Sequence, residues 1–214
     1  MAKYPGVSPS VTRRLPRYYR FLGELMNSGA ERISSREFAE IIGLTASQIR
    51  QDLNCFGGFG QQGYGYNVAM LYQEIGRILG VDRMHPAILI GAGNLGLAIA
   101  NHMAFEQRGF KLVGIFDNNP KVVGQEIRGL TVRSISELVA VCEEYRPKAA
   151  FLCIPRGAAM ELADTLVDMG VKGFWNFSHY DLSIAYGEKI AVENVHLGDS
   201  LMTLSYQVNQ FIDE

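Results

Sequence analysis

The sequence predicts an α/β protein in which an N-terminal winged-helix (helix-turn-helix) domain precedes a Rossmann-like parallel sheet and a C-terminal helix. Three observations support this fold class. Two short helical patterns separated by a glycine turn lie within the first 60 residues, a glycine-rich turn follows an apolar run near residue 90, and apolar runs then alternate with helical patterns. We therefore expect domains over residues 1–83, 84–195 and 196–214.

Charge and cysteine content restrict the class of protein. The net charge is −2, but residues 1–83 hold 10 Lys and Arg against 7 Asp and Glu, whereas residues 84–214 hold 10 against 15. The basic excess indicates a nucleic-acid partner for the first part alone, although a solvated helix face would have the same composition. Three widely spaced cysteines without a CxxC motif, and no signal-peptide pattern, favour a reducing cytoplasm. The uncharged stretch 84–105 is interrupted by proline and glycines, so we predict a strand, turn and helix there rather than a membrane span.

The first domain opens with an amphipathic helix. Pro9 and Pro16 suit a helix start, and apolar residues follow a helical period up to Gly29, which fits a C-terminal cap. The inward positions are Leu15, Tyr18, Tyr19, Leu22, Leu25 and Met26.

Two capping boxes then predict a helix-turn-helix. Ser34-x-x-Glu37 opens one short helix, Gly43 breaks it, and Thr45-x-x-Gln48 opens the next. The inward residues of the two helices are Phe38, Ile41, Ile42, Ile49, Leu53 and Phe56. A further amphipathic helix over 69–79 closes the domain.

The outward face of the second of these helices has side-chain types that contact base edges in DNA, since Arg pairs with guanine and Gln or Asn with adenine. A polar surface helix without a ligand is the alternative. The segment 56–68 alternates aromatic and small residues, which predicts a β-hairpin that enters a minor groove as a wing, or else a purely structural hairpin. The candidate DNA-binding residues are Ser47, Arg50, Gln51 and Asn54 on the helix, Gln61, Gln62, Gly63 and Tyr64 on the wing, and Arg13, Arg14 and Arg17 as phosphate contacts.

The glycine-rich turn after residues 87–90 fits a dinucleotide-binding fingerprint. Gly91-Ala92-Gly93-Asn94-Leu95-Gly96 joins a buried strand to a helix over 94–105, and the next strand, 111–116, ends in Asp117. The glycines allow a tight turn, a close approach to a pyrophosphate and close helix packing, and N–H groups at the helix start bind the phosphates. Asp117 would accept hydrogen bonds from ribose hydroxyls and repel a 2′-phosphate, which favours NAD(H) over NADP(H). A glycine-rich turn without a ligand is the alternative.

Further apolar runs complete a doubly wound sheet. We expect strands over 149–154, 173–177 and 189–192, with helices over 135–145 and 157–169. Such sheets bind ligands at the carboxyl ends of their strands, where ordinary turns also occur. The candidate cofactor-binding residues are the fingerprint residues Gly91, Ala92, Gly93, Asn94, Leu95 and Gly96 together with Asp117, Asn118, Pro155, Asn176, Phe177 and Ser178.

The last predicted helix, 196–212, has an apolar stripe at heptad spacing. The stripe could pack on its own sheet, but a helix at the chain end with no following element favours a dimerisation or exchanged element. Its members are Leu197, Leu201, Leu204, Val208 and Phe211.

Together these residues resemble the Rex family of bacterial redox-sensing transcriptional repressors over nearly the whole chain. The most specific matches are Ile49-Arg-Gln-Asp-Leu53, Phe56-Gly-Gly-Phe-Gly60, Gly63-Tyr-Gly-Tyr66, the fingerprint, Gly170-Val-Lys-Gly-Phe-Trp-Asn-Phe177 and Val192-Glu-Asn-Val195. The resemblance implies a homodimer with winged-helix and Rossmann domains and an exchanged C-terminal helix. It also implies that palindromic operators in double-stranded DNA are bound when NAD⁺ dominates and released when NADH binds.

The chain departs from the family pattern at a few positions. Arg50-Gln51 stands where the family usually has Arg-Lys, and Gln61-Gln62 stands where the wing tip is often basic. Fewer cations imply fewer phosphate contacts and a shallower salt dependence of DNA binding. His102 and His196 also stand where some relatives have other interface residues.

Other functions stay open at this point. An NAD-dependent dehydrogenase would need a proton-transfer residue beside the nicotinamide, but the sequence has no Tyr-x-x-x-Lys motif and its four histidines form no clear catalytic pair. A thiol-based regulator would act through Cys55 near the recognition helix. A coenzyme A domain would keep the glycines without requiring Asp117. We expect no catalytic residues, no metal ligands and no membrane partner.

Overall fold

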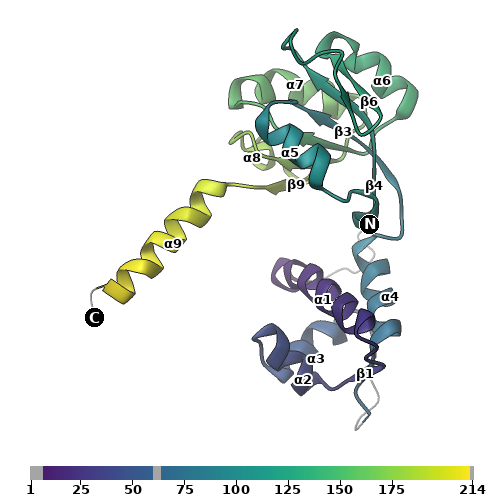
Figure 1. Ribbon diagram of the computed structural model, residues 1–214, viewed down its shortest axis with the longest axis vertical. Helices are drawn as coiled ribbons and strands as arrows, with labels where there is room; N and C mark the ends of the chain where they lie inside the picture. Colours follow the sequence, from purple (N-terminus) through teal and green to yellow (C-terminus); the bar gives the residue numbers. More distant parts are fainter. Residues whose placement is uncertain (1–6, 60–63, 213–214) are drawn as a thin grey trace. The chain divides into compact units, whose positions relative to one another are not determined.

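The computed structural model describes residues 7–59 and 64–212 (Figure 1). The chain divides into two compact units, an N-terminal unit of Met1–Asp82 and a C-terminal unit of Arg83–Glu214. The predicted wing-tip residues Gln61, Gln62 and Gly63 lie outside the described residues.

The predicted helix-turn-helix is confirmed in the N-terminal unit. Ser34 and Glu37 form the expected capping box, and Gly43 ends that helix in the left-handed conformation that glycine adopts without strain. The helices of the unit are α1 (Pro9–Asn27), α2 (Ser35–Ile42), α3 (Ala46–Asn54) and α4 (Val68–Leu79).

The second predicted capping box is only half formed. Thr45 accepts the backbone N–H of Gln48 at 3.1 Å, as expected for an N-cap. The Gln48 side chain, however, donates to Asp52 one turn further along α3 rather than returning to the cap. A buried acceptor on the same helix competes with the cap, and the sequence motif does not reveal it.

The predicted hairpin over 56–68 is not seen in its described part. Residues 56–59 form no strand, and β2 (Tyr66–Asn67) pairs instead with β1 (Arg32–Ile33) in antiparallel register. Sequence reasoning missed β1 because it is only two residues long and its partner is more than 30 residues away. The strand that follows the predicted wing, β2, therefore pairs with a strand that lies between α1 and α2 in the sequence.

One apolar cluster joins the four helices. Tyr18, Phe38, Ile42 and Ile49 are fully buried in it, as predicted. Ile41 is 44% exposed, so its predicted inward position is wrong. Phe38 and Ile42 lie one turn apart and already fill the inward stripe of this short helix. Met26, near the end of α1, is likewise 41% exposed rather than buried.

The C-terminal unit contains the predicted Rossmann-like sheet. In the described residues the strand order is β5-β6-β4-β3-β7-β8-β9, parallel throughout except for the β5–β6 hairpin. Six of these strands follow the doubly wound order 3-2-1-4-5-6, so the fold class is confirmed. The strands are β3 (His85–Ile90), β4 (Phe110–Asp117), β5 (Glu126–Ile127), β6 (Leu130–Ser134), β7 (Ala149–Leu152), β8 (Gly173–Asn176) and β9 (Ala191–Asn194).

Helices cover both faces of this sheet. The helices of the C-terminal unit are α5 (Asn94–His102), α6 (Leu138–Tyr145), α7 (Arg156–Asp168), α8 (Leu182–Tyr186) and α9 (Leu197–Ile212), with 3₁₀ turns η1 (Glu106–Arg108), η2 (Ile135–Glu137) and η3 (Gly187–Lys189); α9 packs on neither face. Sequence reasoning missed β5, β6 and α8 because they are short or only weakly patterned. The helix predicted over 94–105 ends at His102, since Phe105 turns back into the core and stacks on Phe151 at 5.2 Å.

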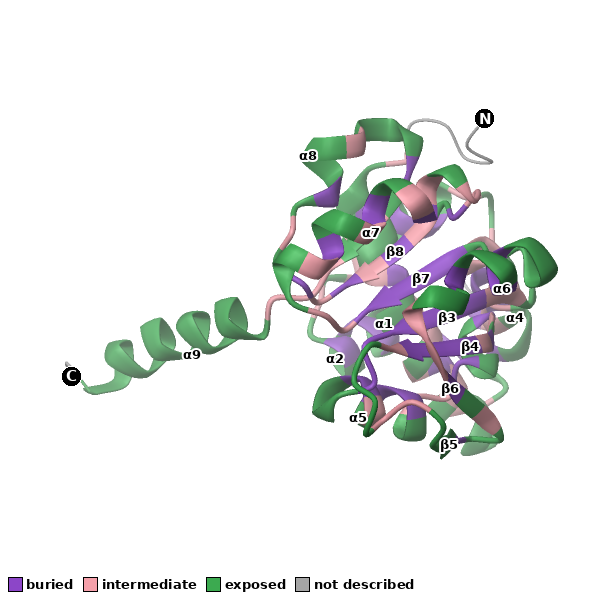
Figure 2. Cartoon of the chain, turned by 90° about the horizontal axis from the view of Figure 1, so that it is seen from above, coloured by how far each residue is buried: buried purple, intermediate pink, exposed green. Residues whose placement is uncertain are grey.

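The alternating side chains of β3 divide the core in two. Ile88 and Ile90 face a cluster formed with α6, α7 and α8, whereas Ala87 and Leu89 face a cluster formed with α5. Figure 2 shows the central strands as a buried layer between helices. Only α5 and η1 pack on the second face, so the half of that face over β7, β8 and β9 lacks a helix among the described residues.

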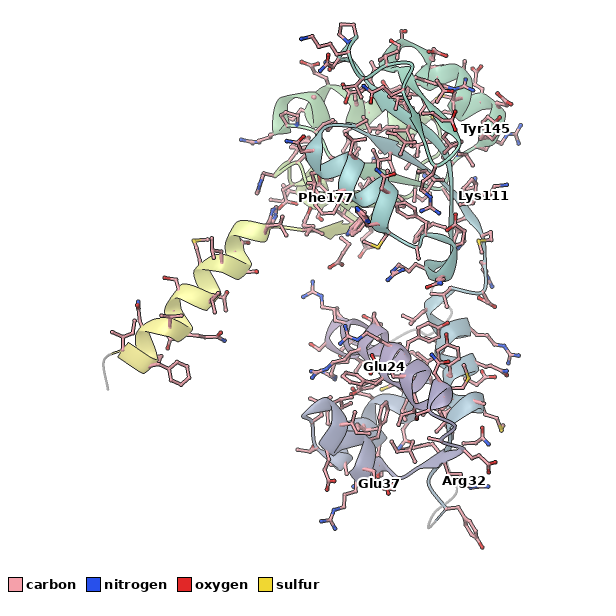
Figure 3. All side chains as sticks on the ribbon, viewed as in Figure 1. Glu24, Arg32, Glu37, Lys111, Tyr145 and Phe177 are labelled. Carbon is pink, nitrogen blue, oxygen red and sulfur yellow. The ribbon has the colours of Figure 1, made fainter. Side chains whose placement is uncertain are left out.

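The C-terminal helix α9 is exposed along its described length. Leu197, Leu201, Leu204, Val208 and Phe211 are 42–81% exposed. Figure 2 shows the whole helix in the exposed colour, and Figure 3 shows side chains projecting from every side of it. Within the described residues, no helix is both long and apolar enough to span a membrane.

Candidate functional site

The fingerprint glycines bring a helix start to the carboxyl edge of the sheet. Gly91 has φ +95°, and a Cβ there would lie 2.4 Å from the carbonyl oxygen of Cys153 on the neighbouring strand end. A Cβ on Gly96 would lie 1.8 Å from the carbonyl oxygen of Gly91. Both positions therefore need glycine so that α5 can pack tightly on β3.

Gly93 differs from the other two glycines. It is the N-cap of α5 and has φ −72°, a conformation open to any residue. A Cβ there would meet no atom within 4 Å, because the space beside it is open. Glycine at this position is thus not required by the fold, and the empty space lies beside the N–H groups that begin α5. That is the arrangement that admits a phosphate.

Asp117 ends β4 beside this turn. Its carboxylate accepts the backbone N–H of Ala92 at 2.7 Å and that of Asn119 at 2.8 Å. A carboxylate has about four lone-pair positions, so two further acceptor positions are available for hydroxyl donors. The side chain is held in place from the fingerprint itself, which fixes it next to the helix start.

These residues line a cleft of about 390 Å³ at the carboxyl ends of β3, β4 and β7. Of the predicted cofactor-binding residues, Gly91, Gly93, Asp117, Asn118 and Pro155 line it. The lining residues that sequence reasoning missed are Ile90, Asn119, Val122, Ile135, Cys153, Ile154, Ala158, Glu161 and Leu162. Parallel pairing of β3 with β7 brings the last five to the site, and only the position of Pro155 after a predicted strand gave a signal for them.

The predicted residues after β8 have a different arrangement. Asn176 and Ser178 are buried and hydrogen-bonded to each other, with Ser178 Oγ donating to Asn176 Oδ1 at 2.5 Å. Asn176 Nδ2 also donates to Asn194 Oδ1 at 2.8 Å, which ties this turn to β9. Phe177, labelled in Figure 3, packs edge-on to Trp175 at 4.8 Å. None of the three lines the cleft of 390 Å³.

The root of α9 adjoins the same turn. The backbone N–H of Val195 donates to the carbonyl of Asn176 at 2.9 Å. The rings of His179 and His196 stack with their centroids 4.9 Å apart, and His179 has a left-handed backbone with φ +58°. The turn after β8 and the residues just before α9 are therefore joined by a backbone hydrogen bond and by the two stacked histidine rings.

The outward face of α3 is exposed as predicted. Ser47, Arg50, Gln51 and Asn54 all point to solvent. The Arg50 guanidinium donates to the Ser35 hydroxyl at 2.8 Å, which holds it beside the start of α2. The set is polar and carries one positive charge.

The other candidate DNA-binding residues differ in their exposure to solvent and in their hydrogen-bond partners. Arg13 and Arg17 are exposed on α1, and Tyr64 is 70% exposed at the described edge of the wing. Arg32, on β1, donates to the Tyr64 carbonyl at 3.2 Å and was missed in the sequence because β1 was missed. Arg14 is paired with Asp52 through two hydrogen bonds, and its side chain is 27% exposed.

Two cysteines lie at or next to the candidate sites, Cys153 in the cleft and Cys55 at the end of α3. Burial raises the pKa of Cys153 to about 12, so this thiol stays protonated at neutral pH even though it lines the cleft. Cys55 is exposed and its Sγ donates to the Gln51 carbonyl. The described residues contain no group of three or more His, Cys, Asp or Glu side chains arranged to hold a metal ion.

A second and larger cavity lies at the amino end of the sheet. Its volume is about 740 Å³, and it occupies the half of the sheet face that lacks a helix. Phe105, Phe110, Phe151 and Trp175 form its apolar wall. The basic residues Arg108, Lys148 and Lys172 also line it. An apolar wall of this size is more typical of a surface that packs against another protein segment than of a site for a polar ligand.

Two family models match the chain. Residues 6–54 match the model described as "Putative DNA-binding protein N-terminus", and residues 82–180 match the model described as "CoA binding domain". The redox-sensing transcriptional repressor Rex of Clostridium beijerinckii is 50% identical to the chain over 210 residues, which cover 98% of this chain and 99% of that protein.

Solved structures of one repressor align over nearly the full length. RSP in complex with beta-NAD+ and operator DNA aligns with a TM-score of 0.89 and 51% identity, covering 95% of this chain and 93% of that chain. RSP in complex with beta-NADH aligns with a TM-score of 0.86 and 48% identity, covering 96% and 95%. RSP is described as a Rex-family repressor.

The glycine geometry predicts a difference between two substitutions. Gly96→Ala should lower the free energy of unfolding of the C-terminal unit by roughly 1–3 kcal/mol, because the new methyl group overlaps the Gly91 carbonyl and forces α5 away from β3. Gly93→Ala is the matched control and should leave that free energy almost unchanged, since its methyl group meets open space. Thermal and urea unfolding followed by circular dichroism measure both. Equal stability of the two variants would contradict the packing role assigned to Gly96.

Proposed function

The chain belongs to the Rex family of redox-sensing transcriptional repressors, and on this premise we propose that it binds operator DNA when NAD⁺ dominates and releases it on binding NADH. We assign operator binding to residues 1–83, NAD(H) binding to residues 84–195 and dimerisation to residues 196–214. The observation that supports this most directly is the open space at Gly93, between a helix start and a carboxylate, in a chain about half identical to a repressor solved with NAD⁺ and operator DNA.

The cleft residues fit a dinucleotide. Gly91, Gly93 and Gly96 shape a turn with room for a pyrophosphate, and Asp117 keeps acceptor positions for two ribose hydroxyls. The same carboxylate would repel a 2′-phosphate, and Asn118 and Asn119 beside it have no positive charge to offset that repulsion. We therefore propose NAD(H) rather than NADP(H) as the ligand.

Coenzyme A is the other nucleotide to consider, since the matching family model is named for it. Its adenosine ribose carries a 3′-phosphate, which a carboxylate at Asp117 disfavours. RSP, at about 50% identity, was solved with NAD⁺ and with NADH. Both arguments favour the dinucleotide.

A redox response requires different affinities for the two coenzyme forms. NADH differs from NAD⁺ by a hydride and by the absence of one positive charge on the nicotinamide ring, so only residues around that ring can discriminate between them. Apolar walls favour the neutral reduced ring because they remove the charged oxidised ring from water without replacing its solvation. Changing the protein from mostly DNA-bound to mostly free needs about 3–5 kcal/mol of difference between the two states.

The operator-binding surface is the outward face of α3 together with the wing and the α1 arginines. Arg50 is our candidate for a guanine contact, and Gln51 and Asn54 for adenine contacts, with Ser47 beside them. Arg13, Arg17 and the wing residues Gln61, Gln62, Gly63 and Tyr64 are candidates for backbone or minor-groove contacts. Arg14 is less suited to this role because Asp52 holds its guanidinium.

Two unfilled surfaces support a homodimer with an exchanged helix. The apolar stripe of α9 is exposed in the single chain, and half of one sheet face also lacks a cover. The side chains of α9 include an acid, Asp199, and no base in the described residues, whereas the cavity is lined by three bases, Arg108, Lys148 and Lys172, and by one acid, Glu193. A second copy would cover both surfaces with isologous contacts.

We propose no catalytic activity. The relatives are named transcriptional repressors. The one thiol in the cleft is Cys153 among the described residues, and its raised pKa opposes nucleophilic chemistry.

The redox response predicts unequal effects of the two coenzyme forms. With the operator duplex of the RSP complex as probe, NADH should weaken DNA binding by the full-length protein at least about tenfold, while NAD⁺ leaves it tight. NADPH should have little effect because of Asp117. Fluorescence anisotropy with each coenzyme titrated separately measures this. Equal effects of NADH and NAD⁺ would rule out redox sensing.

The assignment of α3 predicts a localised loss in one variant. Arg50→Ala should weaken operator binding by about 1–3 kcal/mol, because a bidentate contact to a guanine is lost, and should leave the Kd for NADH unchanged. Arg36→Ala on α2 removes the same charge from an exposed position and is the matched control. Loss of NADH affinity in Arg50→Ala would show that the roles of the two units are misassigned.

The dimer proposal predicts that one charge in the stripe of α9 separates the subunits. Leu204→Asp places a carboxylate where a leucine would be buried, so the dimer dissociation constant should rise at least about tenfold. Gln210→Asp adds the same charge to the opposite side of α9 and should leave the dimer intact. Sedimentation velocity over a concentration series distinguishes the two. Identical behaviour of both variants would argue against the stripe as the interface.

A further inference from the structure

The N-terminal unit contains a buried ionic network that links α1 to α3. Asp52 is 1% exposed and is the one charged side chain among the buried residues that the structure describes. Arg14 donates to it twice, from Nε to Oδ2 at 2.6 Å and from Nη2 to Oδ1 at 2.8 Å. The Tyr18 hydroxyl donates to Oδ2 at 2.6 Å, and Gln48 Nε2 donates to Oδ1 at 2.8 Å. The carboxylate is therefore fully engaged.

We infer that Asp52 is a positioning residue for DNA recognition: through Arg14 and Tyr18 it fixes the rotation of α3 about its own axis and so aims the outward side chains at the bases. The inference rests on the proposed function of α3 as the recognition helix. Asp52 itself touches no DNA in this account, because it lies on the inward side of the helix.

Stability alone is a weak explanation for such a network. Removing the Asp52 carboxylate from water costs several kcal/mol, the Arg14 side chain that pairs with it stays 27% exposed, and apolar residues of similar volume often replace a buried ion pair without loss of stability. Apolar packing is already available, since Leu15, Ile49 and Leu53 are buried in the same cluster. Burial opposes the carboxylate form, yet the hydrogen bonds from Arg14, Tyr18 and Gln48 outweigh it and hold the pKa of Asp52 below its usual value.

The network adds a fixed rotational orientation of α3 to this apolar packing. Apolar contacts through Ile49 and Leu53 tolerate small rotations of the helix, whereas a two-point guanidinium–carboxylate pair holds one relative orientation. The donors on α1 come from Arg14 and Tyr18, which lie one turn apart, so they hold the carboxylate from the same side. The rotation of α3 is thus set relative to α1 rather than by the shape of the core alone.

The effect on the outward face follows from helix geometry. Arg50 and Asn54 each lie two positions from Asp52, roughly 200° around the helix. A rotation of about 10° moves a side-chain end roughly 5–6 Å from the axis by about 1 Å. That shift is larger than the width, about 0.5 Å, of the range of donor–acceptor distances, about 2.7–3.2 Å, over which a hydrogen bond is made. A loose α3 would therefore lose base contacts while its charge near the DNA backbone stays the same.

The decisive experiment replaces both charges and the Tyr18 hydroxyl together and leaves only the half-buried Gln48 amide without its partner. The full-length triple variant Arg14→Met/Tyr18→Phe/Asp52→Leu removes one positive and one negative charge together, so the net charge is unchanged. With NAD⁺ present, its affinity for the operator duplex of the RSP complex should fall at least about tenfold, while its affinity for a random duplex stays within about threefold. Its melting temperature should not fall, and its Kd for NADH should stay unchanged. A triple variant that melts no lower and prefers the operator as strongly as the wild type would overturn the inference.

A milder pair of variants decides the matter if the triple variant melts at a lower temperature. Tyr18→Phe removes a single donor to Asp52 and keeps the buried ring, so the ratio of operator to random affinity should fall about threefold. Tyr19→Phe is the matched control, because Tyr19 is the next residue on α1 and stacks on Tyr72 rather than bonding to α3. Equal ratios in these two variants would overturn the inference.

The DNA preference of the wild-type protein shows whether a negative result contradicts this inference or the proposed function. Failure of the wild type to prefer the operator over a random duplex in NAD⁺ would contradict the proposed function. A wild type that does prefer it, together with a stable triple variant that keeps the preference, would contradict the positioning role of Asp52 alone.

Discussion

The close contact between α5 and β3 is the constraint on which the C-terminal unit depends. Gly96 lets the helix approach until the position of a Cβ would overlap the Gly91 carbonyl, and this contact puts the helix start at the edge of the sheet. Asp117 is then held by the Ala92 N–H, so the strand end and the turn share one hydrogen bond. Backbone packing therefore brings together a helix dipole, an open position at Gly93 and a fixed carboxylate.

The same unit is incomplete on its other side. The doubly wound order places α6, α7 and α8 on one face of the sheet, whereas the second face has α5 and, over β7 and β8, a cavity of about 740 Å³ whose wall includes Phe105, Phe151 and Trp175. An exposed apolar helix follows at the chain end. Burying apolar area yields favourable free energy at roughly 25 cal/mol per Å². Within the described residues of the C-terminal unit no segment covers either surface, so association with a second chain would be favourable.

Local signals in the sequence predicted most of the fold, and distant contacts account for the errors. The Ser34 capping box and the strand, turn and helix around Gly91–Gly96 were predicted correctly because their residues lie close together in the sequence. β1 was missed because its partner lies more than 30 residues away, and the Asp52 network because Arg14 is 38 residues away. Arg14 was predicted as a phosphate contact since sequence shows a charge but not what neutralises it. The same limit left Ile135, Ile154 and Glu161 out of the predicted cleft, because parallel pairing brings them to it.

The turn after β8 shows how the two ends of the proposed switch are connected within one unit. Asn176 and Ser178, predicted as cofactor contacts, bond to each other, to Asn194 and to the backbone N–H of Val195. They therefore tie the carboxyl edge of the sheet to the residues that begin α9. A group that moves this turn must also move the root of α9, because a buried amide cannot lose its partners without a cost of about 1–3 kcal/mol each. If α9 packs on a second subunit, that connection makes the dimer arrangement depend on what occupies the edge of the sheet.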